Sequence, residues 1–198
     1  MNTAKGMEPV SPPATTGSRF ARNRPKALAL FAQRGFAQVS LRELASHLEL
    51  TAGSLYNHCS SKEELLLEFI EEHYMALLSL FDRRHRRESP RATLHALIQG
   101  LIAVHDRHPL HFQLATRDTC YLKPDQRLYV DQLRQLLRQR LNSLVCAAGY
   151  ANAGQISMPA LELFEHLPLW LANYSLDDSQ RCAALERILT ATASTSVR

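Results

Sequence analysis

The sequence predicts an all-α protein of about nine helices, with a three-helix N-terminal head followed by a C-terminal helical bundle. Leucines recur at positions i, i+3, i+4 and i+7, which is the period of an amphipathic helix. Only 7 of the 198 residues are Gly, and no segment alternates β-branched with polar residues as a strand would. Residues that commonly begin helices, such as Ser, Thr and Pro, precede most of the segments with this apolar period.

Three short helices are expected in the head. The first runs over about 21–34 and ends at Gly35, a residue suited to a left-handed helix end. Ser40-Leu-Arg-Glu43 is a capping box that starts a second helix. In this motif the Ser oxygen accepts from the Glu backbone amide, and the Glu carboxylate accepts from the Ser backbone amide. Thr51 caps a third helix over about 52–58.

The remaining helices form the expected bundle. Ser61-Lys-Glu-Glu64 is a second capping box, which starts a long helix ending near residue 86. Proline at the first helical position marks three of the later starts, and Pro168 predicts a kink within one helix. The expected ranges are 91–106, a short helix from 109, 124–149, 157–174 and 176–193.

Composition excludes several classes of protein. No apolar run approaches the roughly 20 residues that a membrane helix requires, and the first residues contain no apolar core of a secretory signal. Residues 1–18 are rich in Pro, Ser and Thr and are expected to form a disordered tail. The four cysteines are far apart, which predicts no zinc site and reduced thiols in a cytoplasmic protein.

Positive charge is concentrated at one end of the chain. The first 62 residues carry eight Lys and Arg against three acids, whereas the remainder carries 15 basic and 16 acidic residues. A basic head on a neutral body is the charge distribution of a nucleic-acid-binding protein.

The segment LTAGSLYNHCSSKEELL, residues 50–66, has side chains suited to DNA. Two short helices joined at Leu48–Thr51 form a helix-turn-helix, whose second helix enters the major groove by its N-terminal end. Small residues there would allow a close approach, Thr51 and Lys62 would meet phosphates, and the polar cluster would contact bases or backbone. The alternative is that these are cap and turn residues of an ordinary helical hairpin. The candidate residues are Thr51, Ala52, Gly53, Ser54, Tyr56, Asn57, His58 and Lys62.

The span from Leu28 to Leu66 resembles the DNA-binding domain of the TetR family of bacterial transcriptional regulators. The matching segments are Leu30-Phe31-Ala32, Gly35-Phe36, 40–45, 50–58 and 61–66. The resemblance implies a homodimeric repressor without a cofactor, divided into a DNA-binding domain over 19–66 and an effector-binding and dimerisation domain over 67–198. It also adds Ser40 and Arg42 to the expected DNA contacts and implies that Ser54 and Asn57 tune sequence choice.

Three positions depart from the family pattern. Cys59 stands where an aromatic residue is usual, and Glu49 replaces a common turn glycine, so the turn must tolerate a Cβ or differ in shape. Asn23-Arg24-Pro25 replaces an apolar helix start, which predicts a first helix that begins later, with Pro25 at its first position.

The last two helices have apolar stripes that could pair with their copies in a dimer or face their own core, and the resemblance favours the dimer. The interface residues expected are Leu161, Phe164, Leu167, Trp170, Leu171, Leu185, Ile188 and Leu189. A two-fold dimer would bind palindromic operator DNA.

The body is expected to bind an unidentified small-molecule effector. His105, His108 and His111 surround Pro109; the proline breaks their register, so metal binding is not predicted. The resemblance places this junction near the mouth of a ligand pocket. Candidate effector contacts are His105, His111, Arg117, Tyr121, Arg134 and Trp170. The run after Arg117 also resembles TetR regulators that sense acyl-coenzyme A thioesters.

The sequence therefore predicts a ligand-responsive repressor. The alternative is a helical small-molecule-binding or scaffold protein that does not bind DNA. An enzyme is not predicted, because the chain has no nucleophile–base pair, phosphate-binding loop or metal motif.

Overall fold

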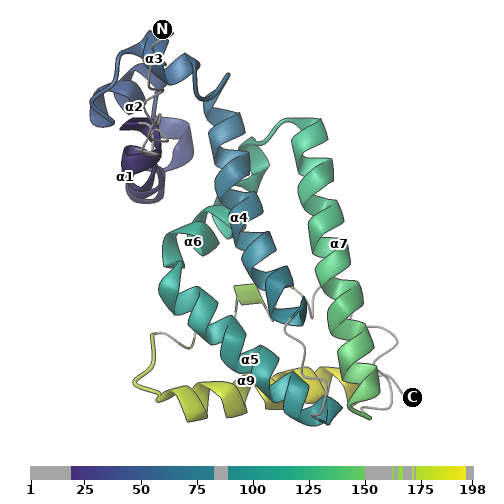
Figure 1. Ribbon diagram of the computed structural model, residues 1–198. Helices are drawn as coiled ribbons and strands as arrows, with labels where there is room; N and C mark the ends of the chain where they lie inside the picture. The colour runs from purple at the N-terminus through teal and green to yellow at the C-terminus, as the bar shows by residue number, and fades with distance from the viewer. Residues whose placement is uncertain are drawn as a thin grey trace, which may run out of the picture.

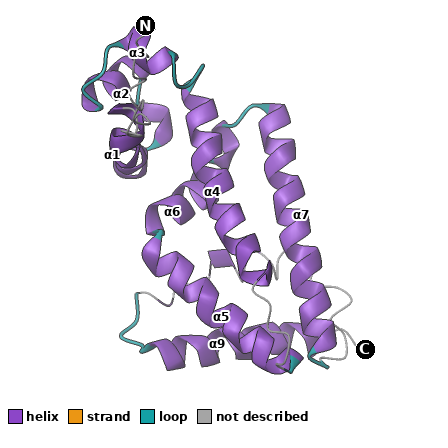
Figure 2. Cartoon of the chain, viewed as in Figure 1, coloured by secondary structure: helices purple, strands orange, loops and turns teal. Residues whose placement is uncertain are grey.

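The structure is a computed structural model, which describes residues 19–82, 89–149, 162, 165, 166, 171 and 173–194. Within these ranges the regular secondary structure comprises eight α-helices and two short 3₁₀ helices joined by loops, with no strand (Figure 2). The predicted all-α class is confirmed. The predicted tail over 1–18, the kink at Pro168 and most of the expected helix over 157–174 lie outside the described residues.

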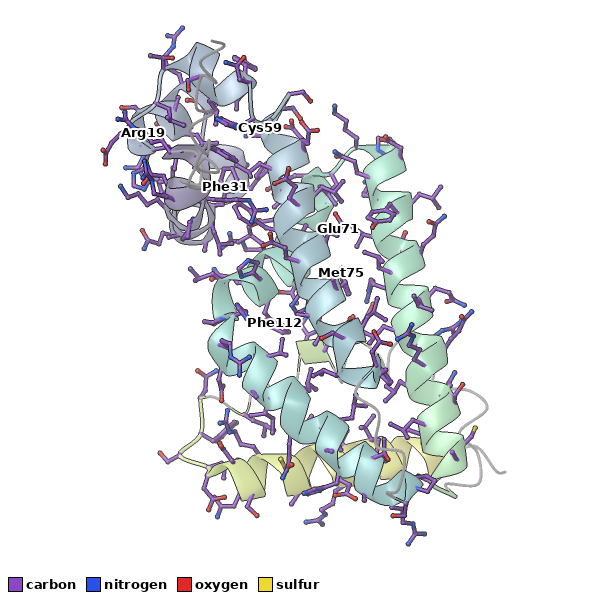
Figure 3. All side chains as sticks on the ribbon, in the orientation of Figure 1. Arg19, Phe31, Cys59, Glu71, Met75 and Phe112 are labelled. Carbon is purple, nitrogen blue, oxygen red and sulfur yellow. The ribbon has the colours of Figure 1, made fainter. Side chains whose placement is uncertain are left out.

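The head consists of α1 (Arg19–Arg34), the 3₁₀ turn η1 (Phe36–Gln38), α2 (Leu41–His47) and α3 (Ala52–Tyr56). Its core includes three aromatic rings in edge-to-face contact, with Phe31 5.2 Å from Phe36 and 6.4 Å from Phe69 between ring centroids. Figure 3 shows Phe31 on the inner side of the head. Gly35 ends α1 with φ +86°, a backbone conformation that favours glycine.

The body is built around α4 (Lys62–Asp82), which begins in the head and runs down between α6 and α7 (Figure 1). It is completed by α5 (Pro90–Arg107), α6 (Pro109–Arg117), the 3₁₀ turn η2 (Thr119–Tyr121), α7 (Pro124–Ala147) and α9 (Asp178–Ser194). Proline occupies the first position of α6 and α7, as predicted, and also that of α5, which was expected to begin one residue later, at 91. In Figure 1, α9 lies across the end of the body and packs on α5.

Helix α6 holds the end of α1 through side chains that we call the α6 clamp: Gln113, Arg117 and Asp118. The Arg117 guanidinium donates to the carbonyl oxygens of Phe31 at 2.9 Å and Ala32 at 3.1 Å, and Gln113 also donates to Ala32. Buried Asp118 holds the guanidinium from behind at 2.7 Å. The Phe31 carbonyl also accepts from the Gly35 amide at 2.9 Å, so the clamp reinforces the end of α1 and joins head to body.

The start of α1 differs from the prediction. Pro25 lies inside the helix rather than at its first position, and α1 begins at Arg19. Buried Phe20 explains the extra turn, because its ring stacks on His58 with centroids 4.6 Å apart and planes 6° from parallel. This contact links residues distant in sequence, and it favours the helical path despite the cost of an interior proline.

The predicted dimer residues have two outcomes. Leu161, Phe164, Leu167 and Trp170 lie outside the part of the chain with described side chains, and Leu171 and Ile188 are partly buried. Leu185 and Leu189 retain only 1% and 4% of their surface in the single chain. Both side chains pack in the core of the single chain, and their expected interface role stays a prediction.

Two histidines are buried in the body around Phe112, which Figure 3 shows between α6 and α4. The ring of His73 lies 5.6 Å from that of Phe112, and the ring of His105 lies 4.8 Å from it. Burial lowers the pKa of His73 to about 3 and also lowers the pKa of His105. Both imidazoles are therefore neutral in the folded protein at neutral pH.

Acidification should destabilise the protein through His73. The unfolded chain protonates this residue below its ordinary pKa of about 6.5, whereas the folded chain does so only near pH 3. Between these values the free energy of unfolding should fall by about 1.4 kcal/mol per pH unit for this histidine alone. Urea unfolding at pH 7.5, 6.0 and 5.0 measures the slope. In His73→Phe the slope should be shallower by about that amount; an unchanged slope would contradict the assignment.

Candidate nucleic-acid interface

The capping box that starts α2 is present as predicted. The Glu43 amide donates to Ser40 Oγ at 3.2 Å, and the Ser40 amide donates to Glu43 Oε2 at 2.8 Å. The bond from the Ser40 backbone is the main cause of a lowered Glu43 pKa. Ser40 Oγ also donates to this carboxylate. The hydroxyl expected to meet a phosphate is thus held in place at an exposed helix start, where its DNA contact stays a prediction.

The second capping box is displaced by one residue. The Glu64 amide donates to Ser61 Oγ at 3.2 Å, as expected. The Glu64 carboxylate, however, accepts from the backbone and hydroxyl of Ser60 rather than from the Ser61 amide. Two serines, Ser60 and Ser61, therefore cap the start of α4, and the capped turn begins one residue closer to α3 than predicted.

The turn between α2 and α3 contains a residue in the left-handed conformation that is not glycine. Glu49 has φ +57°, a conformation that strains L residues. Two side chains from α1 hold the turn: Asn23 donates to the carbonyl of Leu48 at 2.9 Å, and Lys26 forms an ion pair with Glu49 at 2.9 Å. The turn therefore tolerates Glu49 in place of the usual glycine: it contains a left-handed residue and is anchored to α1.

Helix α3 exposes its first turn. Thr51 Oγ1 accepts from the Ser54 amide at 3.1 Å, and Leu55 is buried as the anchor predicted for this helix. Thr51, Ala52 and Gly53 are exposed. A Cβ placed on Gly53 would meet no atom of this chain within 4 Å. The protein's own packing therefore does not require glycine here, and the open space faces outward.

The polar cluster that follows α3 is also exposed, with Tyr56 retaining 54% of its surface and Asn57 and His58 open to solvent. The stacking of His58 on Phe20 fixes the orientation of its ring. Arg42 is exposed on α2. The structure therefore brings the predicted contact residues of α2 and α3 to accessible positions on the head.

Lys62 is more engaged than the sequence suggested. Its ammonium donates to the carbonyls of Phe36 at 3.1 Å and Val39 at 3.0 Å, and lies 4.3 Å from the Phe36 ring centroid. An ammonium has three donors, so one is left for the predicted phosphate contact. The structure assigns most of this side chain to holding the loop before α2 against α4.

Cys59 is buried between α3 and α4 (Figure 3), retaining 3% of its surface, with Sγ 3.8 Å from the carbonyl oxygen of Leu55. Burial raises its pKa to about 11, with a further contribution from Glu64 and Glu68. A thiol in this environment stays protonated at neutral pH and is a poor nucleophile. It packs the head where the family pattern has a larger aromatic residue.

The predicted effector residues make separate contacts, and their role in effector binding stays a prediction. His105 packs on Phe112, His111 contacts Glu72 at 3.0 Å, Arg117 belongs to the α6 clamp, and Tyr121 lies against Phe36. Trp170 lies outside the described residues. Arg134 lines a cavity in the body and pairs with Glu165 at 3.1 Å.

Among the described residues there is neither a metal-binding cluster nor a membrane-spanning helix. Across the described ranges no three His, Cys, Asp or Glu side chains converge on a common point where a metal ion could bind. None of the described helices combines the length and apolar character needed to cross a bilayer.

Several residues that shape the head were missed in the sequence. Phe20, Asn23, Gln113 and Asp118 act through contacts with residues at least 25 positions away or through buried charge. No sequence pattern around Asn23 indicated that its side chain would contact the helix-turn-helix. Asp118 directly follows Arg117, so the pair itself was visible, although its target on α1 was not.

Comparison with known proteins identifies the head. Residues 26–69 match the sequence model of the family "Bacterial regulatory proteins, tetR family". A 66-residue stretch is 33% identical to YuxN, an uncharacterized HTH-type transcriptional regulator of Bacillus subtilis (strain 168). That match covers 33% of this chain and 23% of the relative, so the chain aligns with under a quarter of that protein's length.

Solved structures share the whole fold. A TetR-like regulator from Rhodococcus sp. RHA1 superposes with a TM-score of 0.75 at 18% identity, covering 94% of this chain and 100% of that one. PfmR from Thermus thermophilus gives 0.70 at 20% identity, over 85% and 97%. AibR, solved with isovaleryl coenzyme A and operator DNA, gives 0.68 at 19%, over 87% and 98%. The predicted family resemblance and two-part helical fold are confirmed.

Replacing Glu49 should show that the turn is strained. In Glu49→Gly the left-handed conformation costs less, which should make the folding equilibrium roughly five-fold more favourable despite the lost ion pair with Lys26. Glu49→Ala is the matched control, because it loses the same ion pair but keeps the Cβ. Urea unfolding should give a higher midpoint for Glu49→Gly than for the wild type and a lower one for Glu49→Ala. Equal midpoints for the two variants would contradict this account.

Proposed function

We propose that this TetR-family chain is a cytoplasmic homodimeric repressor that leaves palindromic operator DNA when a small-molecule effector binds its body. The observation that carries the proposal is the exposed face of α3, where Gly53 is open to solvent and the polar side chains of Tyr56 and Asn57 point outward. A helix that presents small residues first and hydrogen-bonding residues next can enter a major groove closely and read base edges.

The proposal divides the chain into a DNA-binding domain over 19–66 and an effector-binding and dimerisation domain over 67–198. It gives the dimer interface to the segment around 161–171 and to α9, with Leu185, Ile188 and Leu189. DNA contacts are assigned to Ser40, Arg42, Thr51, Ala52, Gly53, Ser54, Tyr56, Asn57, His58 and the remaining donor of Lys62. The charge of the head supports this assignment, since the exposed cations Arg19, Arg22 and Arg42 can meet phosphates.

The nature of the effector is a separate question. AibR was crystallised with isovaleryl coenzyme A and operator DNA, and the run after Arg117 resembles regulators that sense acyl-coenzyme A thioesters. An acyl-coenzyme A is therefore one candidate for this chain. A helical protein of the same fold without DNA binding is the competing assignment, and binding of operator DNA separates the two.

Removing exposed head residues should weaken operator binding. Tyr56→Ala should reduce the affinity for DNA from upstream of the protein's own gene by about ten-fold, the usual cost of one good base or backbone contact. Arg42→Ala should reduce the slope of log affinity against log salt by about 1, because one phosphate contact is lost. Fluorescence anisotropy at several salt concentrations measures both.

The control for these variants is Arg127→Ala, which removes an exposed cation from α7, outside the head. It should leave both affinity and salt slope unchanged. If Tyr56→Ala and Arg42→Ala bind as the wild type does, the repressor assignment is wrong and the scaffold assignment stands.

Gly53→Ala should separate stability from DNA binding. Alanine fits the open space and is the better helix former, so the free energy of unfolding should rise by up to about 1 kcal/mol. The added methyl group should nevertheless weaken operator affinity by about ten-fold, because it would stand between α3 and the bases. Urea unfolding and anisotropy measure the two effects. Affinity equal to that of the wild type would contradict close approach at this position.

A further inference from the structure

A cavity of about 160 Å³ lies in the body, between α4, the α6–η2 junction, α7 and the residues around 165. Its lining comprises Tyr74, Ala115, Thr116, Thr119, Arg134, Glu162, Glu165 and His166. At about 30 Å³ per water in the liquid, the volume exceeds what one bridging water requires and is small for a coenzyme. It suits a molecule of a few non-hydrogen atoms.

Two charged groups in this lining make fewer hydrogen bonds than they can. Arg134 donates through one terminal nitrogen to Glu165 Oε2 at 3.1 Å, which is a single bond rather than the two-pronged pairing available to these groups. Arg134 Nε and Glu165 Oε1 are buried, and neither has a hydrogen-bond partner among the described residues. Glu165 retains only 3% of its surface. Such groups are costly to leave unsatisfied.

The other polar groups of the lining are largely committed. Thr116 donates to the carbonyls of Phe112 and Gln113, Thr119 donates to that of Ala115, and His166 Nδ1 contacts the carbonyl of Glu162 at 2.7 Å. The buried atoms of the lining left to satisfy are Arg134 Nε, which needs an acceptor, and Glu165 Oε1, which needs a donor.

The charge of the lining restricts the ligand further. Arg134 contributes one positive charge, and Glu162 and Glu165 contribute two carboxylates. Burial raises the pKa of Glu165, and the ion pair with Arg134 opposes this shift. A carboxylate ligand would face two like charges, and an ammonium would leave Arg134 Nε without an acceptor.

We propose that this cavity binds an uncharged small molecule with a donor and an acceptor on neighbouring atoms, of which a primary carboxamide is the simplest case. The amide oxygen accepts from Arg134 Nε, and the amide nitrogen donates to Glu165 Oε1. This inference rests on the proposed function, because it names the class of effector that the body takes. It differs from the acyl-coenzyme A candidate, whose phosphates and size do not suit this cavity.

The position of the cavity connects it with the head. Thr116 and Thr119, which line it, flank Arg117 and Asp118 of the α6 clamp along the chain. A ligand that pushes on this turn moves the side chains that hold the end of α1. Binding is therefore placed where it can change the orientation of the DNA-binding head.

The test uses the full-length protein and three probes of similar shape: butyramide, butyrate and butylammonium. Isothermal titration at pH 7.5 should show butyramide binding about ten-fold or more tightly than either ion, since each ion leaves one buried group unpaired. This comparison needs no variant. Tighter binding of butyrate or butylammonium, or no binding of any probe, overturns the proposal.

Two matched variants locate the site. Glu165→Gln and Glu186→Gln each remove one carboxylate charge from the body, but Glu186 lies on α9, outside the cavity lining. Glu165→Gln should weaken butyramide binding about ten-fold or more, and Glu186→Gln should leave it within about two-fold. Equal effects of the two variants overturn the proposal in favour of a simple charge effect. Circular dichroism confirms that both variants fold.

Operator binding separates this inference from the proposed function. If butyramide binds as described but the protein does not bind DNA from upstream of its gene, the repressor assignment fails and the ligand site stands. If DNA is bound, and isovaleryl coenzyme A releases it equally well from the wild type and Glu165→Gln while butyramide has no effect, the ligand site is wrong and the repressor assignment stands.

Discussion

The grip of α6 on the end of α1 is the interaction on which the arrangement of the protein depends. Arg117 donates to two carbonyls at the negative end of the α1 dipole, and Asp118, buried behind it, keeps the guanidinium in place. On another side of the head, Arg24 pairs with Glu68 and Glu72 of α4. Hydrogen bonds to charged groups contribute about 1.5–3 kcal/mol each when well shielded, and the partial exposure of Arg117 reduces that value.

This grip gives a physical route from the body to the DNA-binding face. The helix-turn-helix is anchored to α1 by Asn23 and by the stacking of Phe20 on His58, so α1 and α3 move together. The cavity beside Arg134 touches the same turn that carries the clamp. A ligand shifts such an equilibrium only if it prefers one head orientation, and the contact of the cavity wall with the α6–η2 junction supplies a reason for that preference.

The sequence was sufficient for features set by neighbouring residues. Helix periodicity, the Ser40–Glu43 box, the Thr51 cap and the proline starts depend on local geometry, and all of them are present in the structure. It was insufficient where partners are distant along the chain. The early start of α1 depends on His58, the role of Arg117 on carbonyls 85 and 86 residues away, and the burial of Leu185 on its packing against α5. The candidates for DNA contact could be predicted from their residue types, but only the structure shows that they are exposed.

Hydrogen exchange measured by mass spectrometry on Arg117→Met tests the central role of the α6 clamp most directly. Methionine keeps an apolar stem but removes every hydrogen bond from this side chain to α1. Loss of about 1.4 kcal/mol or more of head stability should raise exchange in α1, α2 and α3 at least about ten-fold, while exchange in α7 stays as in the wild type. Unchanged exchange in the head, or an equal increase in head and body, would contradict the account.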